Sequence, residues 1–140
     1  MKSKVCFFLI FTLSLSFVCE ARQFSRCELV RQLRNHRFPA NKLRQWVCLI
    51  ENHSGGRTDL ISRANRSGYR EYGLFQLSDR FWCNKSDLPG KDCNVTCADL
   101  LTDDITKAAK CAKKVYKRHG FTAWYGWSKC QGSLPDISSC

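Results

Sequence analysis

The sequence is poor in acidic residues and contains no long hydrophobic run beyond its first 21 residues. Its 12 Asp and Glu residues stand against 23 Lys and Arg residues, which gives a formal net charge of +11. Internal repeats, low-complexity tracts and linker segments are also missing. We therefore expect one soluble domain with no membrane span.

The only apolar run lies at the start of the chain. Lys2 and Lys4 precede the apolar residues 5–19, a segment that is short for a membrane span and interrupted by hydroxyl side chains. Ala21 is a small residue at a plausible cleavage position. The pattern predicts a signal peptide over residues 1–21 rather than an uncleaved anchor, and residues 22–140 as a secreted, extracellular domain.

Cysteine is abundant. The chain has 10 cysteines, of which Cys6 and Cys19 lie in the expected signal peptide. The remaining even number, in a small secreted domain, indicates a disulfide framework, although spacing alone does not assign the pairs. Zinc is the competing interpretation, but the close pair Cys93 and Cys97 has no second close pair or His pair. We expect no metal and no cofactor.

The excess of positive charge favours anionic surfaces such as bacterial envelopes and acidic glycans as partners. No nucleic-acid-binding motif accompanies the charge, so we do not expect nucleic acid as the ligand. Solubility alone is the alternative explanation of the charge.

Hydrophobic spacing and end signals predict a mainly helical chain. Ser25 and Glu28 form a capping box at the start of the first helix. Gly55 and Gly56 end the second helix, and Gly120 ends the third. The expected helices cover residues 26–35, from 40 or 41 to the glycine pair, about 102–118 and about 123–129.

Between the second and third helices the pattern changes. Residues 60–62 and 69–75 predict a β-hairpin with a polar turn at residues 65–68. A cysteine-rich loop follows over residues 83–97. Helices with one small antiparallel sheet make the fold class α+β.

Seven stretches together carry a family signature. They are RCELV (26–30), WVC (46–48), EYGLFQL (71–77), RFWC (80–83), LLTDDIT…CAKK (100–114), AWYGW (123–127) and SLPDISSC (133–140). With them the chain resembles the C-type lysozymes, most closely the insect members, over essentially all of residues 22–140. The resemblance implies a mainly helical lobe, a small antiparallel β lobe and a sugar-binding cleft between them. It also implies the disulfides Cys27–Cys140, Cys48–Cys130, Cys83–Cys97 and Cys93–Cys111.

The resemblance further implies a retaining muramidase site with two carboxyl groups. One stays protonated and gives its proton to the leaving oxygen, whereas the other stays ionised and attacks or stabilises the cationic sugar. In the family the proton donor lies five residues after the cysteine of the WxC motif, and His53 occupies that position here. The ionised partner precedes the Tyr-Gly of the β motif, which is Glu71 where aspartate is usual.

His53 is a poor replacement for the acid. By the family pattern Trp124 walls the pocket, and burial there favours neutral imidazole. A charged imidazolium would face a transition state that is also positive. Glu51 is the nearest carboxylate in the sequence, but two residues along a helix turn it by about 200° away from the cleft. We expect Glu51 to be a solvated helix residue.

The sugar-binding surface is better retained. Aromatic faces with a few fixed polar groups suit a glycan groove, whereas we expect Trp46 and Trp127 to belong to the core. The resemblance assigns sugar contacts to Asn65, Gln76, Ser78, Phe81, Trp82, Ala123 and Trp124.

A related calcium-binding protein, α-lactalbumin, uses aspartates at the start of the third helix. Asp99, Asp103 and Asp104 are present in this chain, but Lys107 occupies a position where a ligand carboxylate would be needed. We therefore expect no calcium, because the ion requires several oxygen ligands.

The sequence predicts a monomeric, secreted lysozyme-like protein. We expect it to bind β-1,4-linked glycans that contain N-acetylglucosamine, with hydrolysis lost or weak because of His53. One alternative is an active muramidase with an atypical acid. A second is a cationic bacterial-envelope-binding protein with a vestigial groove.

Overall fold

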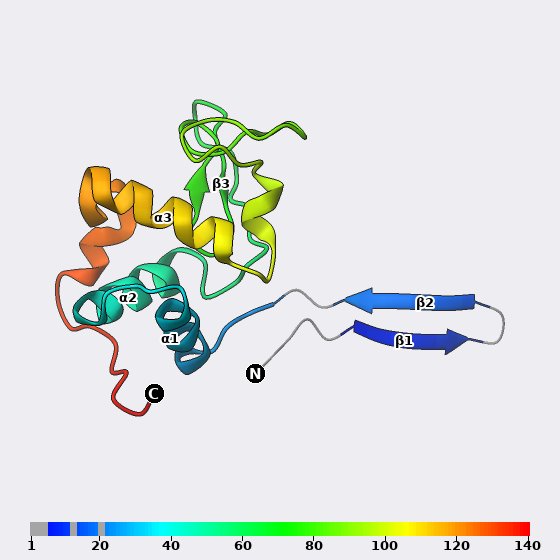
Figure 1. Cartoon of the computed structure of the whole chain (residues 1–140), viewed down its shortest axis with the longest axis horizontal. Coiled ribbons are helices and arrows are strands. Elements are labelled where there is room, and N and C mark those ends of the chain that lie inside the picture. The colour runs from blue at the N-terminus through cyan, green and yellow to red at the C-terminus, as the bar shows by residue number, and fades with distance from the viewer. Residues whose placement is uncertain (1–5, 12–13, 20–21) are drawn as a thin grey trace.

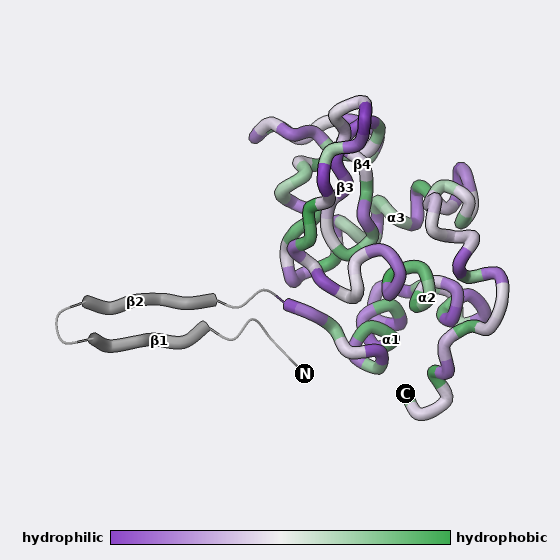
Figure 2. Tube along the Cα trace, turned by 180° about the vertical axis from the view of Figure 1, so that it is seen from behind, coloured by the Kyte–Doolittle hydropathy of each residue, from purple (hydrophilic) through white to green (hydrophobic). Residues whose placement is uncertain are grey.

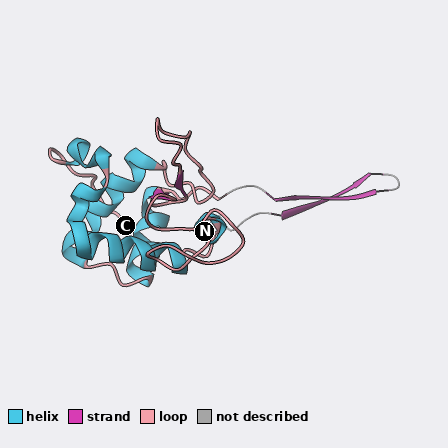
Figure 3. Cartoon of the chain, turned by 90° about the horizontal axis from the view of Figure 1, so that it is seen from above, coloured by secondary structure: helices cyan, strands magenta, loops and turns pink. Residues whose placement is uncertain are grey.

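The structure is a computed structural model that describes residues 6–11, 14–19 and 22–140. Strands β1 (Cys6–Phe11) and β2 (Ser14–Cys19) pair antiparallel, with Cys6 opposite Cys19. Figures 1 and 3 show this ribbon pointing away from the remainder of the chain. The expected cleavage position, residue 21, lies outside the described residues.

Helix α1 (Arg26–Asn35) begins at the predicted capping box. The Ser25 hydroxyl accepts from the Glu28 N–H, and the Glu28 carboxylate accepts from the Ser25 N–H, so the two residues cap each other. The second helical segment starts as a 3-10 turn (Ala40–Lys42) and continues as α2 (Leu43–His53), in agreement with the predicted start.

Helix α3 (Thr106–His119) starts later than predicted. A 3-10 turn (Ala98–Leu101) precedes it, and Thr102 is extended, with φ −87° and ψ 159°. Oδ1 of Asp104 accepts from the backbone N–H of Thr106 at 3.0 Å. This carboxylate satisfies a free donor of the first helical turn, so the predicted start near residue 102 is wrong.

The last part of the chain is helical but not α-helical. Gly120 ends α3 with φ of 67°, as predicted. Two 3-10 helices follow, Gly120–Ala123 and Tyr125–Cys130. They replace the single short helix expected over residues 123–129.

The β lobe is a short sheet with bridging turns. Strand β3 (Glu71–Tyr72) pairs antiparallel with β4 (Leu77–Ser78), a pairing not predicted from the sequence. The predicted hairpin is present as an antiparallel bridge between Ile61 and Tyr72, with backbone hydrogen bonds from Gly73 to Leu60 and from Ser62 to Glu71 on either side of it. Its polar turn is closed by a hydrogen bond from the Gly68 N–H to the Asn65 carbonyl.

Aromatic side chains fill the centre of the helical lobe. Trp46 of α2 is 1% exposed, and its ring lies 5.0 Å from those of Phe38 and Phe121 and 5.4 Å from that of Trp124, centroid to centroid. In Figure 2 apolar positions alternate with polar ones along α1 and α2, as expected for helices with one buried face. Core packing around Trp46 therefore holds α2 in place.

Four disulfides cross-link the domain, and no described helix has the length and apolarity to cross a membrane. Helices with a small antiparallel sheet confirm the α+β class. The disulfides are the pairs that the resemblance implies: Cys27–Cys140, Cys48–Cys130, Cys83–Cys97 and Cys93–Cys111.

Candidate sugar-binding site

The C-terminal end of α2 is fastened to the β lobe. Ser54 follows the last helical residue and is 4% exposed. Its hydroxyl donates to the carbonyl of Leu74 at 2.7 Å and lies 3.2 Å from the carbonyl of Ile50. Gly56 adopts φ of 82°, and a Cβ atom there would lie 2.7 Å from the carbonyl oxygen of Phe24. Both contacts hold His53, the last residue of α2, at the junction of the two lobes.

The imidazole of His53 lies against the 3-10 helix Tyr125–Cys130. A Cβ atom on Gly126 would lie only 2.4 Å from Nε2 of His53, so the ring contacts the Gly126 backbone directly. The phenol ring of Tyr125 meets the imidazole edge to face, with centroids 4.9 Å apart. Nε2 is buried and has no hydrogen-bond partner among the described residues.

This environment disfavours the charged form of His53. Burial lowers the pKa of the imidazole, and the positive charge of Lys129 lowers this pKa further. A buried nitrogen without a partner gives no compensation to an imidazolium. His53 is therefore a neutral side chain near pH 7.

Glu71 lies in a separate pocket of about 310 Å³. It opens strand β3, where its N–H donates to the hydroxyl of Ser62 at 2.9 Å and its carbonyl accepts from the Ser62 N–H at 2.9 Å. The side chain is half-buried, and burial raises the pKa of its carboxyl group. The other lining residues are Ser62, Arg63, Asn65, Tyr69, Ser78 and Tyr125.

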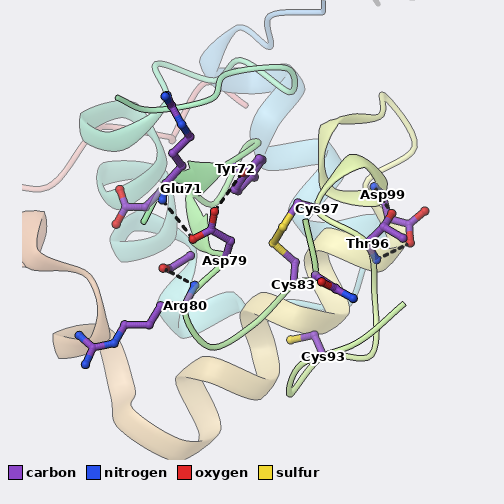
Figure 4. Close-up of a disulfide and its surroundings, with 12 residues drawn as sticks. Glu71, Tyr72, Asp79, Arg80, Cys83, Cys93, Thr96, Cys97 and Asp99 are labelled. Carbon is purple, nitrogen blue, oxygen red and sulfur yellow. Dashed lines mark hydrogen bonds between the residues drawn. A yellow bond between two sulfur atoms is a disulfide. The ribbon is translucent and has the colours of Figure 1, made fainter. Parts of the chain in front are cut away.

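A second carboxylate, Asp79, holds the strand that carries Glu71. Asp79 is 2% exposed; its Oδ1 accepts from the backbone N–H of Arg70 and its Oδ2 from the Tyr72 hydroxyl, each at 3.1 Å (Figure 4). Both oxygens are therefore used within the β lobe. Asp79 therefore positions β3. It was not predicted as a site residue, and its place next to Ser78 was the only feature of the sequence that could have indicated it.

Glu51 points away from Glu71's pocket and binds α1. Its two carboxylate oxygens accept from Nε and Nη2 of Arg26 at 3.0 and 2.9 Å. This ion pair agrees with the prediction that Glu51 lies away from the cleft. It differs from the prediction in one respect, because Glu51 is paired with Arg26 and not simply solvated. This pairing commits the nearest carboxylate of α2 to a structural contact.

A second pocket, of about 410 Å³, carries exposed aromatic surface. Phe81 is 51% exposed, and the guanidinium of Arg80 lies over its ring, 4.8 Å from the centroid. Trp82 is 8% exposed and lines the same pocket, together with Ala123. These three predicted sugar contacts therefore line one pocket, which Asp92, His119 and Thr122 complete.

The remaining predicted contacts divide between pocket and core. Asn65 and Ser78 line the Glu71 pocket. Gln76 is 5% exposed, and its Nε2 donates to the carbonyls of Leu60 and Gly73, so its amide stabilises the loop after β3. Trp124 is also buried.

Trp124 has mainly a structural part. Its Nε1 donates to the carbonyl of Phe75 at 2.8 Å, and its ring packs against Trp46. The residue that contacts His53 is its neighbour Tyr125, which is 80% exposed and also lines the Glu71 pocket. Tyr125 and Tyr69 were not predicted as site residues, although Tyr69 shares the face of Glu71 by strand alternation.

The aspartates near α3 are each engaged by protein groups. Asp99 accepts from the Thr96 N–H and pairs with Lys107 at 3.2 Å, and Asp103 accepts from the Thr58 hydroxyl. Within the described part of the chain, no three His, Cys, Asp or Glu residues are grouped to hold a metal ion. These carboxylates act as caps and ion-pair partners.

Comparison with known proteins places this geometry in context. The sequence model of the C-type lysozyme/alpha-lactalbumin family matches residues 22–140. A lysozyme of Bombyx mori is 64% identical over 122 residues, which cover 86% of this chain and 88% of that protein. A lysozyme of Galleria mellonella is 60% identical over 121 residues, covering 85% of this chain and 100% of that protein. The crystal structure of a lysozyme from Litopenaeus vannamei superposes with a TM-score of 0.72 at 32% identity, covering 81% of this chain and 91% of that chain.

Proposed function

Because this chain belongs to the C-type lysozyme/alpha-lactalbumin family, we propose that it binds β-1,4-linked glycans and hydrolyses them weakly or not at all. The glycans contain N-acetylglucosamine, as peptidoglycan and chitin oligomers do. The proposal separates two properties of the site, a pocket that holds sugar rings and a position that should supply a proton.

One observation supports the proposal: Nε2 of His53, the residue that the family resemblance assigns to the proton-donor position, is buried against Gly126 and has no partner among the described residues. A general acid must hold its proton in the ground state and release it to the leaving oxygen. Burial lowers the pKa of His53, so near pH 7 the imidazole is not the protonated donor. At lower pH the charge on the ring would oppose the positive transition state.

The carboxyl groups described above do not replace the acid. Of the residues that line the Glu71 pocket, Glu71 alone carries a carboxyl group. Asp79 is buried with both oxygens engaged, and Glu51 pairs with Arg26. These contacts support the proposal that the pair of carboxyl groups that a retaining glycosidase needs is incomplete.

Glu71 adds a second handicap. The ionised partner needs a polar setting that keeps its pKa low, whereas burial raises the pKa of Glu71. The side chain is also one methylene longer than the usual aspartate, and catalytic geometry tolerates errors of only about 0.5 Å.

Sugar binding is supported by the pocket of Phe81 and Trp82. An exposed phenylalanine ring beside a tryptophan wall offers flat apolar surface to the faces of sugar rings. The Ala123 backbone lies at the same pocket and supplies a carbonyl acceptor for an N-acetyl group. We test this property by titrating the tryptophan fluorescence with chitin tetramer; no response at millimolar sugar would contradict it.

The decisive test of catalysis is His53→Glu, with His53→Gln as the matched control that fills the same space without an acid. General-acid help contributes roughly 10²–10⁴-fold, so we expect His53→Glu, or its combination with Glu71→Asp, to raise the wall-clearing rate at least about 100-fold. The control should stay at the wild-type level. A wild-type rate equal to that of an ordinary lysozyme would refute the loss of hydrolysis.

Binding through charge alone is a second candidate, favoured by the net charge of +11. Such binding would disappear at high salt, because exposed charges are screened beyond about 8 Å at physiological ionic strength. It would also occur without any fluorescence response to neutral chitin oligomers. The two titrations therefore separate this candidate from a sugar pocket.

We also propose that residues 1–21 are a signal peptide and that residues 22–140 are secreted as a monomer. Lys2 and Lys4 before an apolar segment, and a domain with four disulfides, support this proposal. Protein recovered from the culture medium should begin at Arg22 and elute from a sizing column at the monomer mass. Retention of the full chain in the membrane fraction would contradict the proposal.

A further inference from the structure

Helix α3 carries a stripe of lysines that the sugar site does not use. At about 100° of rotation per residue, these lysines fall within an arc of about 120°. Five lysine side chains thus start from one face of the helix, over about 15 Å between the first and the last of them. The lysines are Lys107, Lys110, Lys113, Lys114 and Lys117.

These side chains line a groove of about 670 Å³, which we call the lysine groove. Its floor contains the disulfide Cys93–Cys111 and the buried side chain of Val95. The hydrocarbon stems of the lysines can pack along such a floor while their ammonium groups remain at the rim. The groove is therefore a shaped apolar channel with positive charge along its length.

The charge of the groove is poorly neutralised from within the protein. Asp92 is the only carboxylate among the lining residues, and it pairs with Arg118 at 2.6 Å. Lys107 pairs with Asp99 at 3.2 Å, whereas Lys113 and Lys114 donate to backbone carbonyls, which carry no full charge. Neither Lys110 nor Lys117 forms an ion pair within the described ranges.

Lys113 is partly buried. Burial is the main cause that lowers the pKa of its ammonium group, and the positive charge of Arg37 lowers this pKa further. A nearby anion would act in the opposite direction, because opposite charge favours the protonated form. The residues that line the groove include five lysines and one aspartate, so the groove attracts anions.

The lysine groove adjoins the sugar pocket. Asp92 lines both, and Arg118, its ion-pair partner, lies 5.9 Å from the ring centroid of Trp82. A glycan strand in the pocket of Phe81 and Trp82 would therefore have one side next to the lysines. A substituent attached to that strand can enter the groove without any rearrangement of the helix.

We propose that the lysine groove binds a linear phosphodiester polymer that is covalently attached to bacterial wall glycan, while the neighbouring pocket holds the sugar backbone. The part of this proposal that puts the sugar backbone in the neighbouring pocket rests on the proposed glycan-binding function. Lysine suits the polymer because its compact ammonium group attracts phosphate as a point charge without demanding one fixed geometry. A run of lysines about 15 Å long matches a chain of repeated phosphates better than a single anion.

The test uses a fluorescent hexamer of glycerol phosphate that contains no sugar, titrated by anisotropy with the wild-type protein. The variant Lys110→Gln/Lys117→Gln removes two unpaired groove lysines. The variant Arg31→Gln/Lys85→Gln removes the same charge from exposed side chains that do not line the groove. We expect the groove variant to bind about tenfold more weakly and the control to change less than about twofold.

Equal weakening by both variants, or no wild-type binding at low salt, would overturn the proposal. Tighter groove-dependent binding of single-stranded DNA or of acidic phospholipid vesicles would overturn the assignment to a wall polymer. Chitin tetramer is titrated separately. If the protein binds the glycerol phosphate hexamer but not the chitin tetramer, the proposed glycan-binding function is contradicted and phosphate binding by the lysine groove still holds. The last measurement compares isolated cell walls with walls from which the phosphodiester polymers have been removed. The wild-type protein should bind the intact walls better, whereas the groove variant should bind the two wall preparations equally.

Discussion

The contact between His53 and Gly126 makes Gly126→Ala the sharpest probe of the site. The new methyl group would start 2.4 Å from Nε2 of His53 and 3.1 Å from two ring carbons. Ordinary van der Waals contact begins near 3.5 Å, so the ring must move by about 1 Å. Overpacking of this kind destabilises the folded state by about 1–3 kcal/mol. Alanine also lowers the conformational entropy of the unfolded chain, which offsets about 0.5 kcal/mol of that loss.

We therefore expect Gly126→Ala to lower the free energy of unfolding by about 1–2 kcal/mol. In a His53→Ala background the same change should be neutral or slightly stabilising, because the clashing ring is gone. Urea unfolding of the four proteins, with disulfides intact, gives the coupling energy directly. Gly132→Ala is the control, since a Cβ atom there meets no atom within 4 Å.

A second readout follows the ring itself. If the methyl group pushes the imidazole outward, the pKa of His53 should rise toward its ordinary value of 6.5, because burial is the main cause of its depression. Histidine NMR titration measures this shift. A coupling energy below about 0.5 kcal/mol, together with an unchanged pKa, would refute the placement of His53 against Gly126 and the reasoning that depends on it.

Three further predictions concern stability and binding. Ser54→Ala should lower the free energy of unfolding by about 1–3 kcal/mol, measured in urea, because the carbonyl of Leu74 loses its buried donor; an unchanged midpoint would contradict this. Because the pKa of His53 is lowered in the folded state, the unfolded chain binds a proton at His53 more readily than the folded chain does. The contribution of neutral His53 to stability is therefore complete above pH 6.5 and is lost as pH falls through the folded pKa. His53→Gln should flatten that acid-side decline in unfolding curves at pH 5 and pH 8, and a decline of unchanged steepness would count against the assignment. Phe81→Ala should weaken chitin tetramer binding by about tenfold in the fluorescence titration, whereas the exposed control Leu88→Ala should leave it unchanged.

Much of the helical framework could be predicted because its signals are local. The capping box at Ser25 needs only four consecutive residues, and the glycine that ends α3 needs only its own positive φ. The start of α3 could not be predicted in the same way. The carboxylate of Asp103 accepts from the hydroxyl of Thr58, which is 45 residues away in the sequence, while Asp104 caps the first turn at Thr106. The contact with Thr58 is tertiary, so local signals alone do not decide where the helix begins.

The candidate site shows the same division. The family resemblance predicted catalytic positions at His53 and Glu71, and the identities of these two residues follow from the sequence alone. Spacing could not predict that Trp124 turns inward to bond Phe75 while Tyr125 turns outward onto His53. Trp124 is the extended residue between the two 3-10 helices and Tyr125 begins the second of them. The neighbours that these two side chains meet come from distant parts of the chain.

The sequence by itself determined the disulfide-bearing α+β family, the presence of His53 after the WVC motif and the excess of positive charge, since these depend on residue identity and local order. Only the tertiary structure decided that Nε2 of His53 is buried, that Asp79 and Glu51 are already engaged, and that the lysines of α3 share a groove beside the aromatic pocket. Burial and pairing are properties of packing between segments far apart in the chain. They set pKa values and charge balance, and through them what the site can do.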